Sequence, residues 1–279
     1  MNPSEWHHRL RHLIKSPEQV CSNSLYITVL RAFEIQPNFF CSEEYFRRAG
    51  WSEVINAGWI WVTDGDQIVL PPINLVTGEL SKKIHEDVWS DLGDFAPENA
   101  APVFLDYEFL HKPGNLVLDL QGSEWRKFRK NIRKFEKRVN ELPEYRPARL
   151  DDMPSIRLLI ERWLNGLKDD DVHGADIMLD YLLNGENRKV LANRFGHLYG
   201  INVWDYNHKF FNFRFCVCDP DPELFASEYL RMRFFSDPLI SHCWINDGGA
   251  LDRPGLQKFK ESLNPSTIRK MFSWKVKTG

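Results

Sequence analysis

The sequence predicts an α+β fold made of two domains. Two observations indicate it. In the second half, helical and strand-like patterns follow the order helix, helix, β-hairpin, helix, strand, helix, strand. In the first half, a hairpin pattern lies between segments of helical periodicity. A chain of 279 residues is long enough for two domains, and Pro143 marks a joint between residues 1–142 and 143–279.

The composition excludes several protein classes. With 43% apolar and 27% charged residues, the chain is neither disordered nor collagen-like. No apolar run is long enough to span a membrane and the first ten residues lack a secretory pattern, so we expect a cytoplasmic protein. The five cysteines are odd in number and irregularly spaced, which favours reduced thiols over a disulfide framework: Cys21, Cys41, Cys216, Cys218 and Cys243.

Local signals predict two short helices at the start of the first half. An apolar face that carries Trp6, Leu10 and Ile14 indicates the first. Ser42 can cap the second, and Gly50 suits the left-handed position that ends it.

Strands are expected to follow. The runs 59–63 and 67–70 flank a turn sequence and predict a hairpin, which Pro71-Pro72 would end. Residues 81–102 carry no firm signal, and residues 115–120 predict a further strand.

The segment from Trp125 to Leu142 predicts an amphipathic helix with a basic face. Its apolar residues recur at steps of three and four. Between residues 126 and 138, eight cations and one anion give a local charge of +7, while the whole chain carries −3. The cations are Arg126, Lys127, Arg129, Lys130, Arg133, Lys134, Lys137 and Arg138.

This basic face has two interpretations. It could be a solvated surface that keeps the helix soluble. However, cations four residues apart repel each other, and a polyanionic partner would relieve that repulsion.

The second half begins with two predicted helices. Asp151 or Asp152 caps the first, which carries Ile156, Leu159 and Ile160 inward, and the second spans about 175–184. A hairpin follows, formed by residues 198–204 and 210–218.

The predicted elements after this hairpin alternate between helix and strand. Asp221 is the expected cap of the next helix, with Pro222 in its first turn. A strand over 240–245, a helix capped by Asp252 and a last strand over 271–276 complete the chain.

The element order and two matched stretches resemble the GNAT superfamily of acyltransferases. Residues 116–120 and 125–138 are similar to the end of the first domain in Fem-type aminoacyl transferases. The same segment and residues 245–260 are also similar to the catalytic domain of phosphatidylglycerol lysyltransferases, although this chain has Gly249 and Ala250 where that family carries adjacent acids. The resemblance implies tandem GNAT-like (acyl-CoA N-acyltransferase) domains with splayed sheets, an acyl donor in the wedge and an aminoacyl group taken from charged tRNA.

The resemblance and the residue chemistry together suggest a site. Asn246, which could polarise a carbonyl, and Asp247, which could hold an amine or accept its proton, are the candidate catalytic residues, although both suit an ordinary turn. Candidates for binding the substrate are Arg126, Lys127, Arg129, Lys130, Arg133, Trp204, Lys258 and Lys260. We expect the basic face to line the cleft that contains Asn246 and Asp247. No residue spacing indicates a metal site or a resident cofactor.

Three functions remain open from the sequence. The first is transfer of an aminoacyl group from aminoacyl-tRNA to an amine or hydroxyl of a peptide, small molecule, lipid or modified nucleobase. The second uses acyl-CoA as donor, but residues 218–222 offer acids and prolines where CoA enzymes place a glycine-rich turn. The third is a non-catalytic nucleic-acid-binding protein of the same fold.

Overall fold

The computed structural model describes residues 24–65, 68–80, 88–90, 100–113, 122–123, 125–165, 175–207, 209–221, 224–240, 242–250 and 253–276. The predicted helix around Trp6–Ile14, the strand over 115–120 and the cap Asp252 lie outside these residues.

The chain divides into two compact units. Unit 1 comprises Met1–Glu108, Tyr206–Lys209 and Arg269–Gly279, and unit 2 comprises Phe109–Asp205 and Phe210–Ile268. The predicted domain boundary between residues 142 and 143 lies inside unit 2. The division of the chain into domains 1–142 and 143–279 stays a prediction.

Unit 1 contains two short helices and a three-stranded sheet. The helices are α2 (Leu25–Ala32) and α3 (Glu43–Ala49), and the sheet has the order β1 (Ser52–Asn56), β2 (Trp59–Thr63) and β3 (Ile68–Asn74). The Ser42 hydroxyl accepts the Tyr45 N–H at 3.1 Å and Gly50 has φ 71°, which confirms the predicted cap and stop of α3. The hairpin of β2 and β3 is also confirmed by their antiparallel pairing.

The expectation that Pro71-Pro72 ends the hairpin is wrong. β3 continues through both prolines to Asn74. β3 is an edge strand in the order β1-β2-β3. An N–H that points away from the sheet makes no hydrogen bond to another strand, so proline, which lacks an N–H, is tolerated there. The hydroxyl of Tyr26, buried in α2, donates to the Pro71 carbonyl at 2.9 Å and ties the helix to this strand.

The larger sheet is mixed and has the strand order β4-β11-β5-β10-β9-β8-β7-β6. Its strands are β4 (Val88–Ser90), β5 (Ala100–His111), β6 (Glu144–Pro147), β7 (Arg188–Ala192), β8 (Leu198–Tyr206), β9 (Phe210–Cys218), β10 (Trp244–Asn246) and β11 (Thr267–Val276). β8 and β9 are neighbours, as the predicted hairpin requires. β5 was not predicted: residues 81–102 gave no firm signal, and the next predicted strand covered 115–120.

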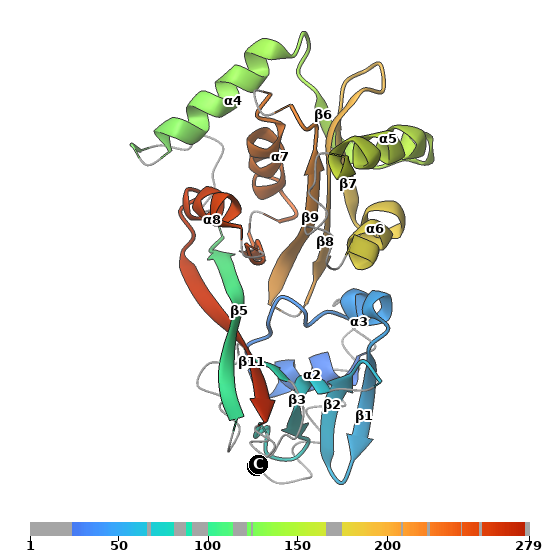
Figure 1. Ribbon diagram of the computed structural model, residues 1–279, viewed down its shortest axis with the longest axis vertical. Helices are drawn as coiled ribbons and strands as arrows, with labels where there is room; N and C mark the ends of the chain where they lie inside the picture. Colours follow the sequence, from blue (N-terminus) through green and yellow to red (C-terminus); the bar gives the residue numbers. More distant parts are fainter. Residues whose placement is uncertain are drawn as a thin grey trace. The chain divides into compact units, whose positions relative to one another are not determined.

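Helices cover both faces of the sheet in unit 2 (Figure 1). α5 (Met153–Leu164) and α6 (Ala175–Asn184) contact β9 on one face, and α7 (Ala226–Phe235) contacts it on the other. α4 (Arg126–Arg138) packs on the outside of α7, and α8 (Pro254–Glu261) lies close to the end of β5. A short 3-10 turn, η1 (Leu150–Asp152), leads into α5.

The sheet opens between β9 and β10. The two strands pair in parallel only from Trp244 to Asn246 against Phe210 to Asn212. β10 then ends, whereas β9 continues to Cys218. Phe213 and Cys216 pack into the core beneath α7, but Phe215 contacts Tyr181 of α6. This break in alternation indicates a bulge in β9 at the point where the strands separate.

Two expected boundaries near this opening are wrong. α7 begins at Ala226 after Phe225, which has φ 58°, so Asp221 does not cap it. The predicted strand over 240–245 is reduced to β10, because residues before it form a turn in which the Asp237 carboxylate accepts the Leu239 N–H at 3.0 Å. Among the residues just described, no helix is both long and apolar enough to cross a bilayer.

Candidate functional site

The first candidate surface is the basic face of α4. Phe128, Ile132 and Phe135 form the buried seam of the helix, and Phe135 stacks on Tyr229 of α7 with ring centroids 4.5 Å apart. The cations occupy the remaining sides and are mostly exposed. Packing of the seam therefore fixes the direction in which the cations point.

Six of these cations line an open hollow of about 470 Å³. Its described lining consists of Arg126, Arg129, Lys130, Arg133, Lys134 and Lys137. We call this set with Lys127 and Arg138 the α4 cationic face. A hollow lined by positive charge is the shape and charge expected of an anion-binding surface.

Some cations of this face contact neighbouring groups. The Arg129 guanidinium donates to the Gly122 carbonyl at 2.7 Å, and the Lys134 ammonium lies 4.7 Å from the Phe225 ring centroid. Arg138 and Asp221 are 3.9 Å apart, with about half of each side chain exposed, so their attraction is weak in water.

The second candidate site surrounds Asp247, directly after β10. The Asp247 backbone N–H donates to the Phe109 carbonyl at 2.9 Å, which fixes the residue beside the end of β5. Its carboxylate is 3.7 Å from the Arg231 Nε of α7 and 3.8 Å from the Lys260 Nζ of α8. Lys260 also donates to the Asp247 backbone carbonyl. All three side chains are buried.

The Asp247 carboxylate has unused hydrogen-bonding capacity. Both of its oxygens, and Arg231 Nε, are buried without a hydrogen-bond partner among the described residues. Burial of such groups costs free energy unless a partner supplies the missing bonds. The carboxylate can therefore accept hydrogen bonds from an amine, amide or hydroxyl that enters the site.

Aromatic packing holds Arg231 in place. Its guanidinium lies 5.0 Å from the Phe213 ring centroid and 4.9 Å from that of Phe259, and it donates to the Ser227 hydroxyl at 2.8 Å. Burial alone would lower the pKa of Arg231, but Asp247 offsets this effect and leaves the pKa raised. Arg231 is therefore a permanent cation beside Asp247.

His111 adds a neutral imidazole to this site. It lies at the end of β5, paired with Ile245 of β10, and in the described part of the chain neither of its ring nitrogens has a hydrogen-bond partner. Burial lowers its pKa from 6.5 to about 4; Asp247 counteracts the shift, while Lys260 and Arg231 add to it. His111 is consequently uncharged at neutral pH and can donate or accept one hydrogen bond.

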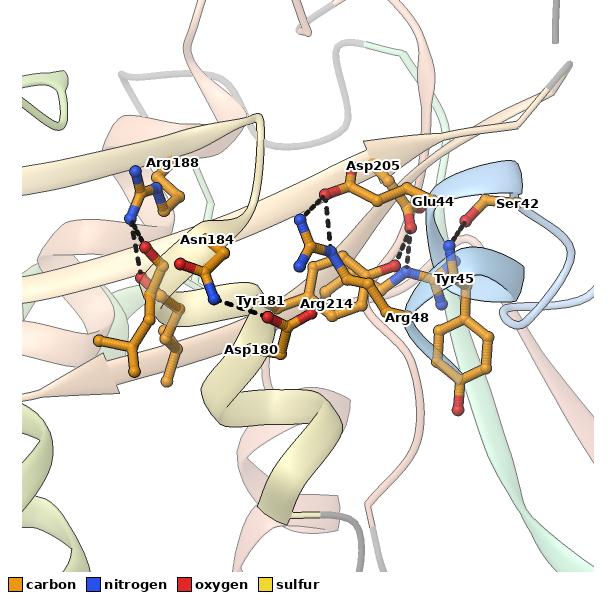
Figure 2. Close-up of polar contacts among 12 residues, drawn as sticks. Ser42, Glu44, Tyr45, Arg48, Asp180, Tyr181, Asn184, Arg188, Asp205 and Arg214 are labelled. Carbon is orange, nitrogen blue, oxygen red and sulfur yellow. Dashed lines mark hydrogen bonds and ion pairs between the residues drawn. The ribbon is translucent and has the colours of Figure 1, made fainter. Parts of the chain in front are cut away.

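A second buried carboxylate on the same sheet provides a contrast. Asp205 accepts hydrogen bonds from the Arg214 guanidinium at 2.6 Å, the Tyr181 hydroxyl at 2.7 Å and the Asn212 amide at 2.9 Å. Figure 2 shows Arg214 facing Asp205 beside α6. Asp205 is satisfied by the fold itself, whereas Asp247 is not.

The structure brings together some of the predicted site residues and separates others. Asn246, Asp247 and Lys260 lie together, although the Asn246 side chain accepts the Gly248 N–H at 2.9 Å and so shapes the turn. Lys258 is exposed on α8. Trp204 packs in the core, with its ring centroid 5.5 Å from that of Phe234.

The described contacts do not place the α4 cationic face beside Asp247. α7 lies between them: Tyr229 contacts α4, and Arg231 contacts Asp247. Residues two apart in a helix point in nearly opposite directions. A ligand that used both sites would therefore have to be extended.

Sequence reasoning missed Arg231 and His111. Arg231 could have been noticed, because it interrupts the apolar side of α7 three and four residues before Phe234 and Phe235. His111 had no comparable signal, since only strand pairing brings it near Asp247. Within the ranges given above, no group of three or more metal-ligating side chains could hold a metal ion.

Comparisons with known proteins identify the fold. No protein-family model and no curated protein matches the chain. A conserved protein of unknown function from Bacteroides thetaiotaomicron VPI-5482 has a TM-score of 0.68 at 17% identity, covering 92% of this chain and 99% of its own. The C-terminal domain of a putative lysylphosphatidylglycerol synthetase from Agrobacterium fabrum has a TM-score of 0.55 at 13% identity, covering 88% and 90%.

The chain has the fold of this synthetase domain. FemX is a further neighbour, with a TM-score of 0.50 at 8% identity over 96% of this chain and 95% of its own. The mixed sheet with its flanking helices confirms the predicted α+β class, and these neighbours share the fold. At these identities the likeness concerns the fold alone.

Proposed function

We propose that the protein is a GNAT-type acyltransferase that moves an aminoacyl group from aminoacyl-tRNA to an amine or hydroxyl acceptor. The acceptor is a peptide, a small molecule, a lipid or a modified nucleobase. The α4 cationic face and its hollow carry the proposal, on a fold shared with FemX and with a synthetase domain.

A purely structural role explains the α4 cationic face poorly. Pairs such as Arg126/Lys130 and Arg129/Arg133 place like charges four residues apart, and each costs a few tenths of a kcal/mol. The first turn of α4 contains no acid, so cations also lie at the positive end of the helix dipole. A phosphate backbone bound in the hollow would relieve both effects.

Asp247 is the proposed acid–base and positioning residue. Its carboxylate oxygens can hold an amine N–H, and Arg231 Nε and Lys260 Nζ lie 3.7 and 3.8 Å from them. An aminoacyl ester is already activated, so holding the amine and accepting its proton would supply much of the catalysis.

The geometry favours a long donor over a small one. The α4 cationic face is exposed while Asp247 is buried on the other side of α7. An acylated tRNA end is long enough to extend from one to the other. The loop after β9 suits CoA less, because Asp219 already pairs with Arg162 at 3.2 Å and adds negative charge.

A transfer assay tests this function. Purified protein is incubated with each of the twenty labelled aminoacyl-tRNAs and a lysate that supplies acceptors. We expect protein-dependent loss of label from one tRNA and its recovery in a non-RNA product. A variant with Lys130→Glu and Arg133→Glu should lose most transfer, whereas Arg157→Glu, an exposed charge change on α5, should leave it unchanged.

The other outcomes distinguish the rival functions. RNA binding without transfer from any tRNA supports a non-catalytic binding protein. Stabilisation by CoA, about 2.7 kcal/mol at a concentration 100 times the dissociation constant, supports an acyl-CoA enzyme.

A further inference from the structure

Several buried polar atoms near the end of β5 make no hydrogen bond to any residue that the structure describes. They are both ring nitrogens of His111, both carboxylate oxygens of Asp247 and the Nε of Arg231. His111 and Asp247 are each 1% exposed, and Arg231 is 6% exposed. Unpaired polar groups at this depth are costly, so a cluster of them favours a bound ligand over a purely structural role.

The three side chains meet along one side of α7. His111 packs against Phe235, with ring centroids 5.1 Å apart, and the Asp247 carboxylate is 3.7 Å from Arg231 Nε. Arg231 and Phe235 are four residues apart in α7, so they lie on the same side of the helix, about 5–6 Å from each other. His111 and Asp247 therefore face neighbouring turns of α7, close enough for one small group to contact both.

The hydrogen-bonding capacity of these atoms defines the ligand that fits them. The Asp247 oxygens accept, Arg231 Nε donates, and the neutral imidazole of His111 has one donating and one accepting nitrogen. A matching group must offer both an N–H and an acceptor oxygen. An amide, or an amine next to an ester carbonyl, meets this condition, whereas a hydrocarbon chain does not.

We propose that His111 donates its ring N–H to the carbonyl oxygen of the acyl group, while Asp247 accepts an N–H from the amine that attacks it. The role deepens the proposed transfer function and rests on it for its chemistry. The amine nitrogen bonds to the carbonyl carbon, the ester C–O bond breaks, and the amine proton passes through Asp247 to the departing ribose oxygen. His111 stabilises the negative charge that develops on the carbonyl oxygen, a task that the sequence alone suggested for Asn246.

The first test measures binding and needs no transfer activity. Acetamide, which carries an N–H and a carbonyl oxygen, is added to protein with isotope-labelled histidine, and the imidazole signals are followed by NMR. The His111 signals are those missing from the His111→Gln spectrum. We expect them to shift with a dissociation constant of about 1–100 mM, while those of the exposed His197 stay in place. His111 signals that remain unchanged throughout the titration overturn the proposal.

The second test separates a catalytic role of His111 from a structural one. His111→Leu should lower kcat for transfer from aminoacyl-tRNA by about 10²–10³-fold with little change in KM, because one donor to the oxyanion is lost. His111→Gln keeps an N–H donor and should recover about tenfold of this loss. His197→Leu is the matched control and should keep the wild-type rate. Equal kcat values for His111→Leu and His111→Gln, or a loss confined to KM, contradict the assignment.

The two tests fail independently. Absence of transfer by the wild-type protein rejects the proposed function, and the acetamide titration then decides by itself whether His111 binds a carbonyl group. The same titration decides if circular dichroism shows that His111→Leu does not fold.

Discussion

At the scale of single residues, two buried aspartates of unit 2 have opposite surroundings. Asp205 receives hydrogen bonds from Arg214, Tyr181 and Asn212, whereas no residue that the structure describes donates a hydrogen bond to the carboxylate of Asp247. The charges of Arg231 and Lys260 balance Asp247 but do not satisfy its lone pairs. A carboxylate kept in this state is better explained by a ligand than by stability.

The charge balance around Asp247 gives a stability prediction. Asp247→Asn removes the described counter-charge of the buried Arg231 and Lys260 and should lower the free energy of unfolding by about 3–5 kcal/mol. Adding Lys260→Met should recover part of the loss, because one uncompensated cation is removed. Chemical denaturation measures both effects. Asp151→Asn, on an exposed residue, is the control, and an equally small effect at Asp247 contradicts the prediction.

His111 gives a prediction about pH. Its pKa is about 4 in the folded protein and 6.5 when unperturbed, so between these values the unfolded chain binds more protons. Stability should therefore fall as the pH drops from about 6.5 to 4, by about 3 kcal/mol from this residue. Unfolding of His111→Leu at pH 4, 5.5 and 7 should lack this component, whereas the exposed His197→Leu should retain it. Identical pH profiles for His111→Leu and the wild type are the contrary result.

At the scale of elements, α4 has two sides with separate roles. Phe128, Ile132 and Phe135 bury the seam and hold the helix on α7. The α4 cationic face lies on the other sides of the helix, and repulsion between its like charges weakens the helix. Stability and the proposed binding should therefore respond in opposite directions to charge changes on this face.

Lys130→Glu tests this opposition. Lys130 lies four residues from Arg126 and from Lys134, so the change turns two repulsive pairs into attractive ones. The free energy of unfolding should rise by about 0.5–1 kcal/mol, while RNA affinity falls. Lys130→Gln should give about half of the stability gain. A Lys130→Glu variant that loses stability would show that this lysine has a structural role.

At the scale of the whole molecule, the distribution of charge should affect RNA binding more than the net charge does. A chain with a net charge of −3 repels polyanions on average, yet one helix concentrates a charge of +7. Binding of RNA should therefore depend on a few contacts at α4 and fall steeply with salt.

The salt dependence of RNA binding measures these contacts. Neutralising Arg126, Arg129 and Arg133 by glutamine should reduce the slope of log K against log salt concentration by about one unit per lost phosphate contact. Arg157→Gln provides the matched control on α5. An unchanged slope in the triple variant would exclude α4 as the RNA-binding surface.

Local signals in the sequence were enough to predict several helices and strands. The cap Ser42 and stop Gly50 bounded α3, the seam of α4 appeared at helical spacing, and the pattern over 198–218 gave β8 and β9. These features depend on residues within a few positions of one another. The resemblance carried by residues 116–138 and 245–260 led from there to the fold that the solved structures share.

Other element boundaries, and the residues that make up the site around Asp247, were decided only by the tertiary structure. β3 runs through Pro71-Pro72 because it is an edge strand, and α7 starts after Phe225 rather than at Asp221. The site around Asp247 joins His111, Arg231 and Lys260, which are far apart in the chain and meet through strand pairing and helix packing. Local composition determines whether a segment can form a helix or strand, but burial and charge pairing depend on which distant segments pack together.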